Sequence, residues 1–201
     1  QGWAGDVTLV LSEPGFDFQG YRIDGLRELQ TAAQLAVLDA WRAGAQMADA
    51  LSVLRSVSHL VVWAAASVMA SWLAELPSSV HLAALQVCEL QSSNGSSVVA
   101  ACPKALNALT LFSPRLTGLP ESLDQLSSLT TLDLIGCRSL TGLPESTGQQ
   151  LAALTTLNLL WCMSLTKLPE SMGQLAALTT LKLSYCRSLT GLPESMGQLA
   201  A

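Results

Sequence analysis

The chain has 201 residues, half of them hydrophobic and only 12% charged, with a formal net charge of -5. Ten basic residues are too few for the positive surface that nucleic-acid or anionic-lipid binding needs, which excludes these partners. Two histidines leave little material for general-base or metal chemistry, so we expect no enzyme, no cofactor and no bound metal. Forty leucines beside 5% aromatic residues predict a regularly packed aliphatic core.

The first half of the chain alternates strand-like runs with helix-like segments. Residues 7–11, 57–62 and 82–87 are short apolar runs that predict strands. Their central leucines, together with Leu35 and Leu109, form a series with steps of 24 to 26 residues. Residues 43–57 and 66–76 are rich in Ala, Leu and Met at helical spacing, which predicts helices between the strands.

One uncharged stretch in this half, residues 56–74, is just long enough to be tested as a membrane span. It contains His59 and four serines and carries the expected strand at Leu60. A buried strand followed by a helix is therefore the preferred interpretation, and a membrane span is the alternative.

From Leu116 onward the sequence repeats itself. The heptapeptide LTGLPES begins at Leu116, returns at Leu140 and Leu189, and occurs at Leu165 with lysine in place of glycine, at intervals of 24, 25 and 24 residues. The first three copies are followed by LTTLxL, whose alternation of leucine with polar residues predicts a strand with one buried face. One strand cannot bury its leucines alone, so neighbouring copies must stack, about 4.8 Å apart, into a parallel sheet.

The pattern LxxLxLxxCxxL, met by Leu129, Leu132, Leu134, Cys137 and Leu140 and twice more downstream, resembles the leucine-rich repeat. The longer combination LxLxxCxxLxxLPESxGQL is similar to the plant-type repeats in the sensor region of nucleotide-binding disease-resistance proteins. The resemblance implies a curved α/β solenoid, with a parallel sheet on the concave side and short helices or 3₁₀ turns on the convex side. Proline after each convex leucine favours turns or a single 3₁₀ turn in the regular repeats.

Two styles of repeat meet near residues 106–116. The phrase from Val98 to Leu106 resembles the repeats of F-box proteins, in which a helix ends in CPxL before the strand. We expect degenerate, helix-containing repeats at residues 1–105 and regular repeats of 23–25 residues at 106–201. Because the chain starts with Gln1 and stops within a repeat, we expect a fragment of a longer polypeptide whose open last repeat favours self-association.

The repeat register also aligns residues that carry chemistry. Cys137, Cys162 and Cys186 occupy one position, within reach of a disulfide, but small thiols that point inward and donate to carbonyls at the strand end are the preferred interpretation. A fourth metal ligand at usable spacing is absent from the sequence. A column of glutamates predicts an exposed, solvated edge, with a cation or basic-partner site as the alternative: Glu121, Glu145, Glu170 and Glu194.

The same register predicts which residues face a partner. On each strand, the positions on either side of the last leucine point out of the concave face, and they vary between copies whereas the leucines do not. Large apolar side chains inside a polar rim are typical of protein-binding patches. The candidate partner-binding residues are Trp63, Phe112, Asp133, Ile135, Asn158, Leu160, Trp161, Lys182 and Tyr185.

These features favour a non-catalytic module that binds a protein partner on its concave face, in intracellular signalling or defence recognition. Two alternatives stay open: the substrate-recognition arm of an F-box ubiquitin-ligase adaptor, and the regulatory region of a kinase or NTPase whose catalytic domain lies elsewhere. No phosphate-binding loop occurs in the sequence. Five cysteines without a CxxC pair are typical of a reducing compartment, so a cytoplasmic location is expected.

Overall fold

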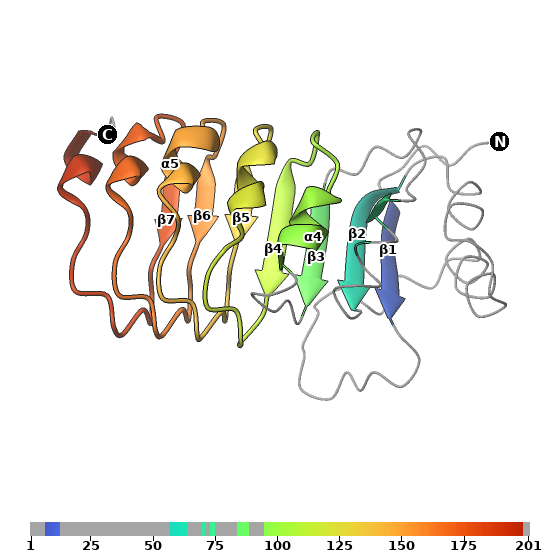
Figure 1. Cartoon of the computed structure of the whole chain (residues 1–201), viewed down its shortest axis with the longest axis horizontal. Helices are drawn as coiled ribbons and strands as arrows, with labels where there is room; N and C mark the ends of the chain where they lie inside the picture. Colours follow the sequence, from blue (N-terminus) through green and yellow to red (C-terminus); the bar gives the residue numbers. More distant parts are fainter. Residues whose placement is uncertain are drawn as a thin grey trace, which may run out of the picture.

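The computed structural model describes residues 7–12, 57–63, 70, 73–74, 84–88 and 95–198. Within these residues, seven strands form one sheet in which the spatial order follows the chain order (Figure 1). All six neighbouring pairs are parallel, so the chain returns to the same edge of the sheet before each new strand. The strands are β1 (Val7–Ser12), β2 (Val57–Trp63), β3 (Ala84–Cys88), β4 (Ala108–Phe112), β5 (Thr131–Asp133), β6 (Thr156–Asn158) and β7 (Thr180–Lys182).

The strand leucines pair with one another along the whole sheet. Leu60 lies opposite Leu85, and the same register continues through Leu109, Leu132, Leu157 and Leu181. These pairs confirm the predicted series of strands from β2 to β7. The series therefore has one strand in each repeat, as a stacked solenoid requires.

At the amino-terminal end the predicted series needs a correction. β1 pairs directly with β2, and Leu9 lies opposite Leu60. The step of the leucine series at Leu35 therefore does not correspond to a strand between β1 and β2 in the sheet. Leu35 itself lies outside the described residues.

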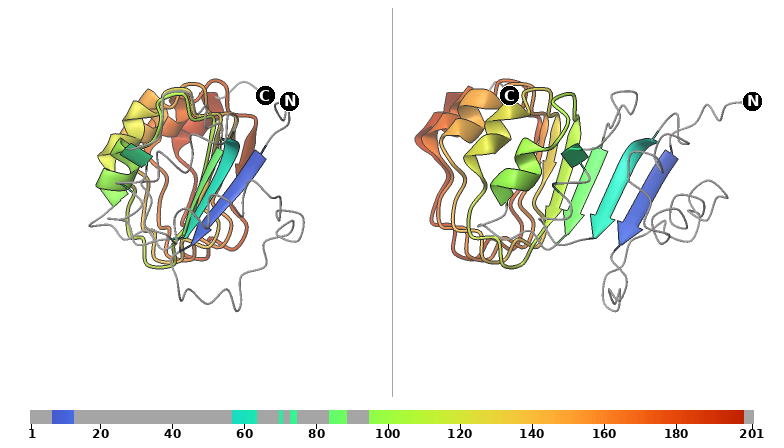
Figure 2. Two further views of the ribbon diagram at one scale, coloured as in Figure 1. Left: turned by 90° about the vertical axis from the view of Figure 1, so that its right-hand side faces the viewer. Right: turned by 45° about the vertical axis from the view of Figure 1, so that its right-hand side comes forward.

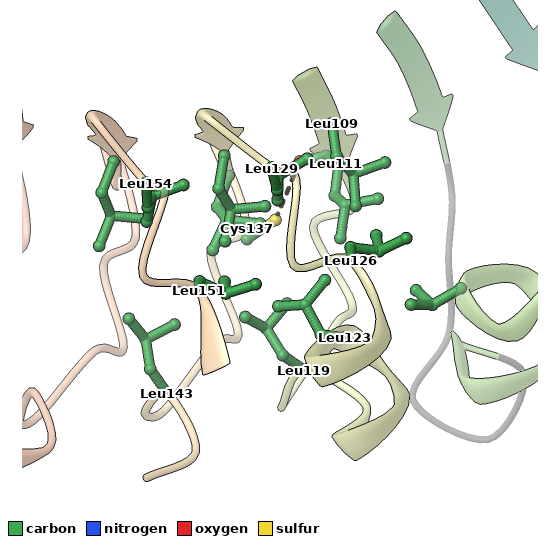
Figure 3. Close-up of a cluster of buried hydrophobic side chains, with 14 of the residues drawn as sticks. Leu109, Leu111, Leu119, Leu123, Leu126, Leu129, Cys137, Leu143, Leu151 and Leu154 are labelled. Atoms are coloured by element: carbon green, nitrogen blue, oxygen red, sulfur yellow. Dashed lines mark hydrogen bonds between the residues drawn. The ribbon is translucent and has the colours of Figure 1, made fainter. Parts of the chain in front are cut away.

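The core lies between the sheet and the return segments. In the central strands the middle leucine is buried and its neighbours are half-buried, which confirms the period-2 interpretation. Behind each strand, leucines from the return segment complete the core, as Leu119, Leu126 and Leu151 do in Figure 3. Burying one leucine side chain contributes about 2 kcal/mol, so an aliphatic core of this kind needs few aromatic residues.

The return segments contain short helices on one side of the sheet (Figure 2). Three of them are 3₁₀ turns, as predicted, and Pro120 before the first is extended, with φ -70 and ψ 145. The other two are α-helices, and the repeat that contains the second of them has an additional glutamine, Gln150, where the other regular repeats have one. The elements are α4 (Gly95–Ala100), η2 (Glu121–Gln125), α5 (Ser146–Gln150), η3 (Glu170–Gln174) and η4 (Glu194–Gln198).

Two rows of threonines form ladders of hydrogen bonds between successive repeats. One row lies just before the strands and the other lies in the segments that follow them. The Thr155 hydroxyl donates to the Thr130 carbonyl over 2.9 Å, and the Thr179 hydroxyl donates to the Thr155 carbonyl over 3.2 Å. A second ladder runs through Thr141 and Thr166, whose hydroxyls each donate to the carbonyl one repeat back. The repeated threonines therefore hold the register between copies.

The predicted helices in the first half fall mostly outside the described residues. Residues 43–57 lie outside them except for Val57, which begins β2. Of residues 66–76, Ala70, Leu73 and Ala74 are helical. No helix in the described part of the chain combines the length and apolar character needed to cross a membrane. Because β2 occupies residues 57–63, a membrane-spanning helix over residues 56–74 is wrong.

Candidate functional site

The face of the sheet turned away from the helices, here called the open sheet face, carries the predicted outward positions (Figure 2). In β5, Thr131 and Asp133 are half-buried on either side of the buried Leu132. The register places equivalent residues side by side across the strands, so each outward position forms a row. One row is Ala108, Thr131, Thr156 and Thr180, and the next is Thr110, Asp133, Asn158 and Lys182.

Two predicted polar residues in the second row also shape the backbone. Asp133 Oδ1 accepts a hydrogen bond of 3.0 Å from the amide of Ile135, and Asn158 Oδ1 accepts one of 3.1 Å from the amide of Leu160. These side chains therefore fix the turns that present the half-buried Ile135 and Leu160. Lys182, which has no acceptor atom, is exposed at the equivalent position.

An aromatic side chain covers the place where β5 ends. A Cβ atom on Gly136 would lie 2.7 Å from Cε2 of Phe112, so the Phe112 ring packs against the backbone of the next repeat. Gly136 also has a φ of 75°, in the left-handed region that favours glycine. Phe112 is thus half-buried at the surface, and its ring packs between its own repeat and the next one.

In the next two repeats, aromatic residues replace that glycine. Trp161 and Tyr185 both have a φ of 65°, which is unusual for bulky side chains. Their rings stack with centroids 3.9 Å apart and planes inclined by 7°. Tyr185 is 52% exposed, so the stack is accessible at the surface. Phe112, Trp161 and Tyr185 thus bring three aromatic rings to the edge of the sheet where β4–β7 end.

We call the segments that follow β4–β7 the carboxyl edge, comprising residues 113–118, 135–142, 160–167 and 184–191. In these segments every charged residue is basic, whereas the segments around the helical turns, residues 119–126, 143–151, 168–175 and 192–198, contain only acidic charges. All strands in Figure 1 point to one edge, so the two signs of charge lie on opposite sides of the solenoid. The basic residues are Arg115, Arg138, Lys167 and Arg187.

The cysteine column forms a ladder inside this edge. The thiol of Cys137 donates to the Leu111 carbonyl over 3.3 Å (Figure 3), and the thiols of Cys162 and Cys186 repeat the contact with the carbonyls of Leu134 and Leu159. Burial raises the pKa of Cys137 to about 11 and that of Cys162 to about 12. The prediction of inward thiols that donate at the strand ends is confirmed. Cys102, Cys137, Cys162 and Cys186 are free thiols.

The glutamate column is exposed, as predicted, but two of its members also make contacts between repeats. The carboxylate of Glu145 accepts a hydrogen bond of 3.1 Å from the amide of Ser171, and that of Glu170 accepts one of 3.3 Å from the amide of Ser195. Glu145 and Glu170 therefore each cap the helical turn of the following repeat. No group of residues suited to hold a metal ion occurs in the described part of the chain.

The predicted site residues fall into two groups. Phe112, Ile135, Leu160, Trp161 and Tyr185 gather along or beside the carboxyl edge, and Asp133, Asn158 and Lys182 form one row on the open sheet face. Trp63 is the last residue of β2, two strands away from β4.

The four basic residues of the carboxyl edge, all exposed, were not predicted as site residues. Arg138 and Arg187 occupy equivalent positions, directly after Cys137 and Cys186. The signal that could have identified them is the sorting of charge between the two halves of each repeat.

Strand, turn, cysteine ladder and threonine ladders together define a leucine-rich-repeat solenoid of the α/β class. No family model and no curated protein matches the chain. Among solved structures, the chain is similar to the leucine-rich repeat domain of the type III effector XopL, with 23% sequence identity and a TM-score of 0.47. That similarity covers 75% of this chain and 60% of the other.

Proposed function

We propose that this chain is a non-catalytic module that binds a protein partner through the open sheet face and the carboxyl edge. The biological setting that we propose is intracellular signalling or defence recognition, in line with the plant-type pattern of the regular repeats. The apolar part of the site is formed by Ile135, Leu160 and the Trp161–Tyr185 stack, and the polar part by the row from Asp133 to Lys182.

The observation that carries this proposal is the pair of stacked rings in the left-handed region. A non-glycine residue there costs about 1–3 kcal/mol, and Gly136 demonstrates that the fold accepts glycine at this position. Aromatic side chains that persist at strained, accessible positions are typical of functional surfaces, and Trp and Tyr dominate the energetics of protein interfaces. If the positions of Trp161 and Tyr185 had only a structural role, glycine would fill them without strain.

Photo-crosslinking tests the proposal. Benzoylphenylalanine at Thr156, in the middle of an outward row, should capture a partner from an extract of the source organism. The same group at Gln149, exposed on α5, is the control and should capture none.

A double variant separates binding from folding. Trp161→Gly with Tyr185→Gly removes both rings and relieves the positive φ, so circular dichroism should be unchanged while capture at Thr156 is lost. Equal capture at Gln149 and Thr156, or capture that survives the double variant, would place the binding surface elsewhere.

A second candidate function is supported by α4. This helix ends at Ala100, and Cys102 and Pro103 follow it, with the Cys102 thiol donating to the Val98 carbonyl over 3.3 Å. Resemblance to F-box adaptors implies a helix that ends in CPxL before a strand, and this chain has CPKAL there, with one more residue before the leucine. An F-box encoded upstream in the same reading frame would favour this candidate, and a nucleotide-binding module there would favour disease resistance.

A further inference from the structure

The basic side chains of the carboxyl edge have no internal counter-charge. Arg138 and Arg187 of this edge are exposed, as is Lys182 at the end of the adjoining strand β7, and none of the three forms an ion pair with any residue of the described range 95–198. The segments of the carboxyl edge contain no acidic residue. Bases that are clustered but unpaired create a local positive potential on a chain whose net charge is -5.

The aromatic stack adds a second property to this edge. Because Trp161 and Tyr185 stack at 3.9 Å, each ring covers one negative face of the other. A partner therefore contacts mainly the edges of the two rings, which carry partial positive charge. It also meets the hydrogen-bond donors of the rings, the indole N–H and the phenol O–H. Arg187 lies two residues after Tyr185 in the sequence. Arg138 has the equivalent position in an earlier repeat, two residues after Gly136.

From this charge complementarity we propose that the carboxyl edge binds an acidic, extended segment of a protein partner. The inference rests on the proposed function and adds the chemistry of the partner. Carboxylates of the segment pair with Arg138, Lys182 and Arg187, while its apolar side chains contact the aromatic stack and Leu160. Charge complementarity of this kind sets specificity and association rate.

A second copy of this chain could supply acidic residues from its own turns, but two of these residues are already in use. The carboxylates of Glu145 and Glu170 accept backbone amides of the next repeat. Turning them toward another molecule would break these caps. A separate acidic partner satisfies the carboxyl edge without that loss.

The test uses fluorescence anisotropy with a labelled peptide of about twelve residues in which Glu alternates with Pro, which stays extended. Matched peptides carry Gln or Lys in place of every Glu. The full chain should bind the Glu peptide at least about fivefold more tightly than the Gln peptide, and raising the salt from about 50 to 300 mM should weaken the binding.

Two matched variants locate the site. Arg187→Gln should weaken binding of the Glu peptide about threefold, and Arg138→Gln with Arg187→Gln about tenfold. Lys104→Gln removes the same charge from an exposed residue in the turn before β4 and should leave the affinity unchanged.

Four results would overturn the inference. They are tighter binding of the Lys peptide, equal effects of Arg187→Gln and Lys104→Gln, tighter binding of a single-stranded RNA than of the Glu peptide, and a salt-sensitive dimer in sedimentation that Arg187→Gln abolishes. If all three peptides bind equally and lose affinity in Trp161→Gly with Tyr185→Gly, the acidic partner is wrong but the proposed function survives. If the double glycine variant loses no binding to any peptide, the proposed function fails as well.

Discussion

At the residue scale, glycine marks the places where one helical turn packs directly on the next. A Cβ atom on Gly148 would overlap the backbone carbonyl of Ser171, and one on Gly173 would lie 2.5 Å from the carbonyl oxygen of Ser195. At Gly118 and Gly191 a Cβ atom would meet nothing within 4 Å. The glycines of one repeat therefore have different roles although they recur with the same period.

This difference predicts opposite outcomes for alanine substitutions. Gly148→Ala should lower the free energy of unfolding by about 1–3 kcal/mol, because the turn at Ser171 must move away. Gly118→Ala should change it by less than about 0.5 kcal/mol. Urea denaturation followed by circular dichroism measures both values, and equal values for the two variants would contradict the close packing of the turns.

The buried thiols predict a pH dependence. Folding raises the pKa of Cys137 and Cys162 from 9.0 to about 11 and about 12, so their stabilising effect is complete below pH 9 and is lost as the pH rises through the folded values. Each thiol should contribute about 1 kcal/mol of this loss by pH 10.

Serine provides the control, because Ser113 is buried at the equivalent position of an earlier repeat. The variant Cys137→Ser with Cys162→Ser should lose less stability than the natural chain when thermal melts at pH 8 and pH 10 are compared. Identical losses in the two proteins would mean that the thiols do not titrate with folding.

At the element scale, the helical turns depend on the preceding repeat for their amino-terminal caps. Glu145 caps η3, whereas Glu121 makes no hydrogen bond to any residue of the described range 95–198. Glu145→Ala should lower the free energy of unfolding by about 0.5–1 kcal/mol. Glu121→Ala removes the same charge and should have little effect, so equal changes in urea denaturation would argue against the cap.

The elements also show what the sequence can and cannot predict. The strands β2–β7 were predictable because leucine recurs with the period of the repeat and alternates with polar residues within each strand. The turns that Asp133 and Asn158 fix were not, because they depend on how a strand ends in space. The caps from Glu145 and Glu170 were missed for the same reason, since each joins residues in two different repeats.

At the scale of the whole molecule, the residues that recur in every repeat form the scaffold, and the residues that vary between repeats form the surface. Leucines, cysteines and threonines make the same contacts in each copy, so changes at the remaining positions leave the scaffold intact. The candidate site was predictable as a set of positions, but its grouping around Trp161 and Tyr185 was not. That grouping arises from two positive φ angles that no periodic pattern encodes.

The central claim is that a partner binds across the open sheet face and the carboxyl edge while the helical turns act as scaffold. Hydrogen–deuterium exchange with and without the Glu-Pro peptide tests it most directly. We expect slower exchange in residues 135–142, 160–167 and 184–191 and no change in residues 119–126 and 168–175. Slower exchange confined to the turns, with an unchanged carboxyl edge, would contradict the account.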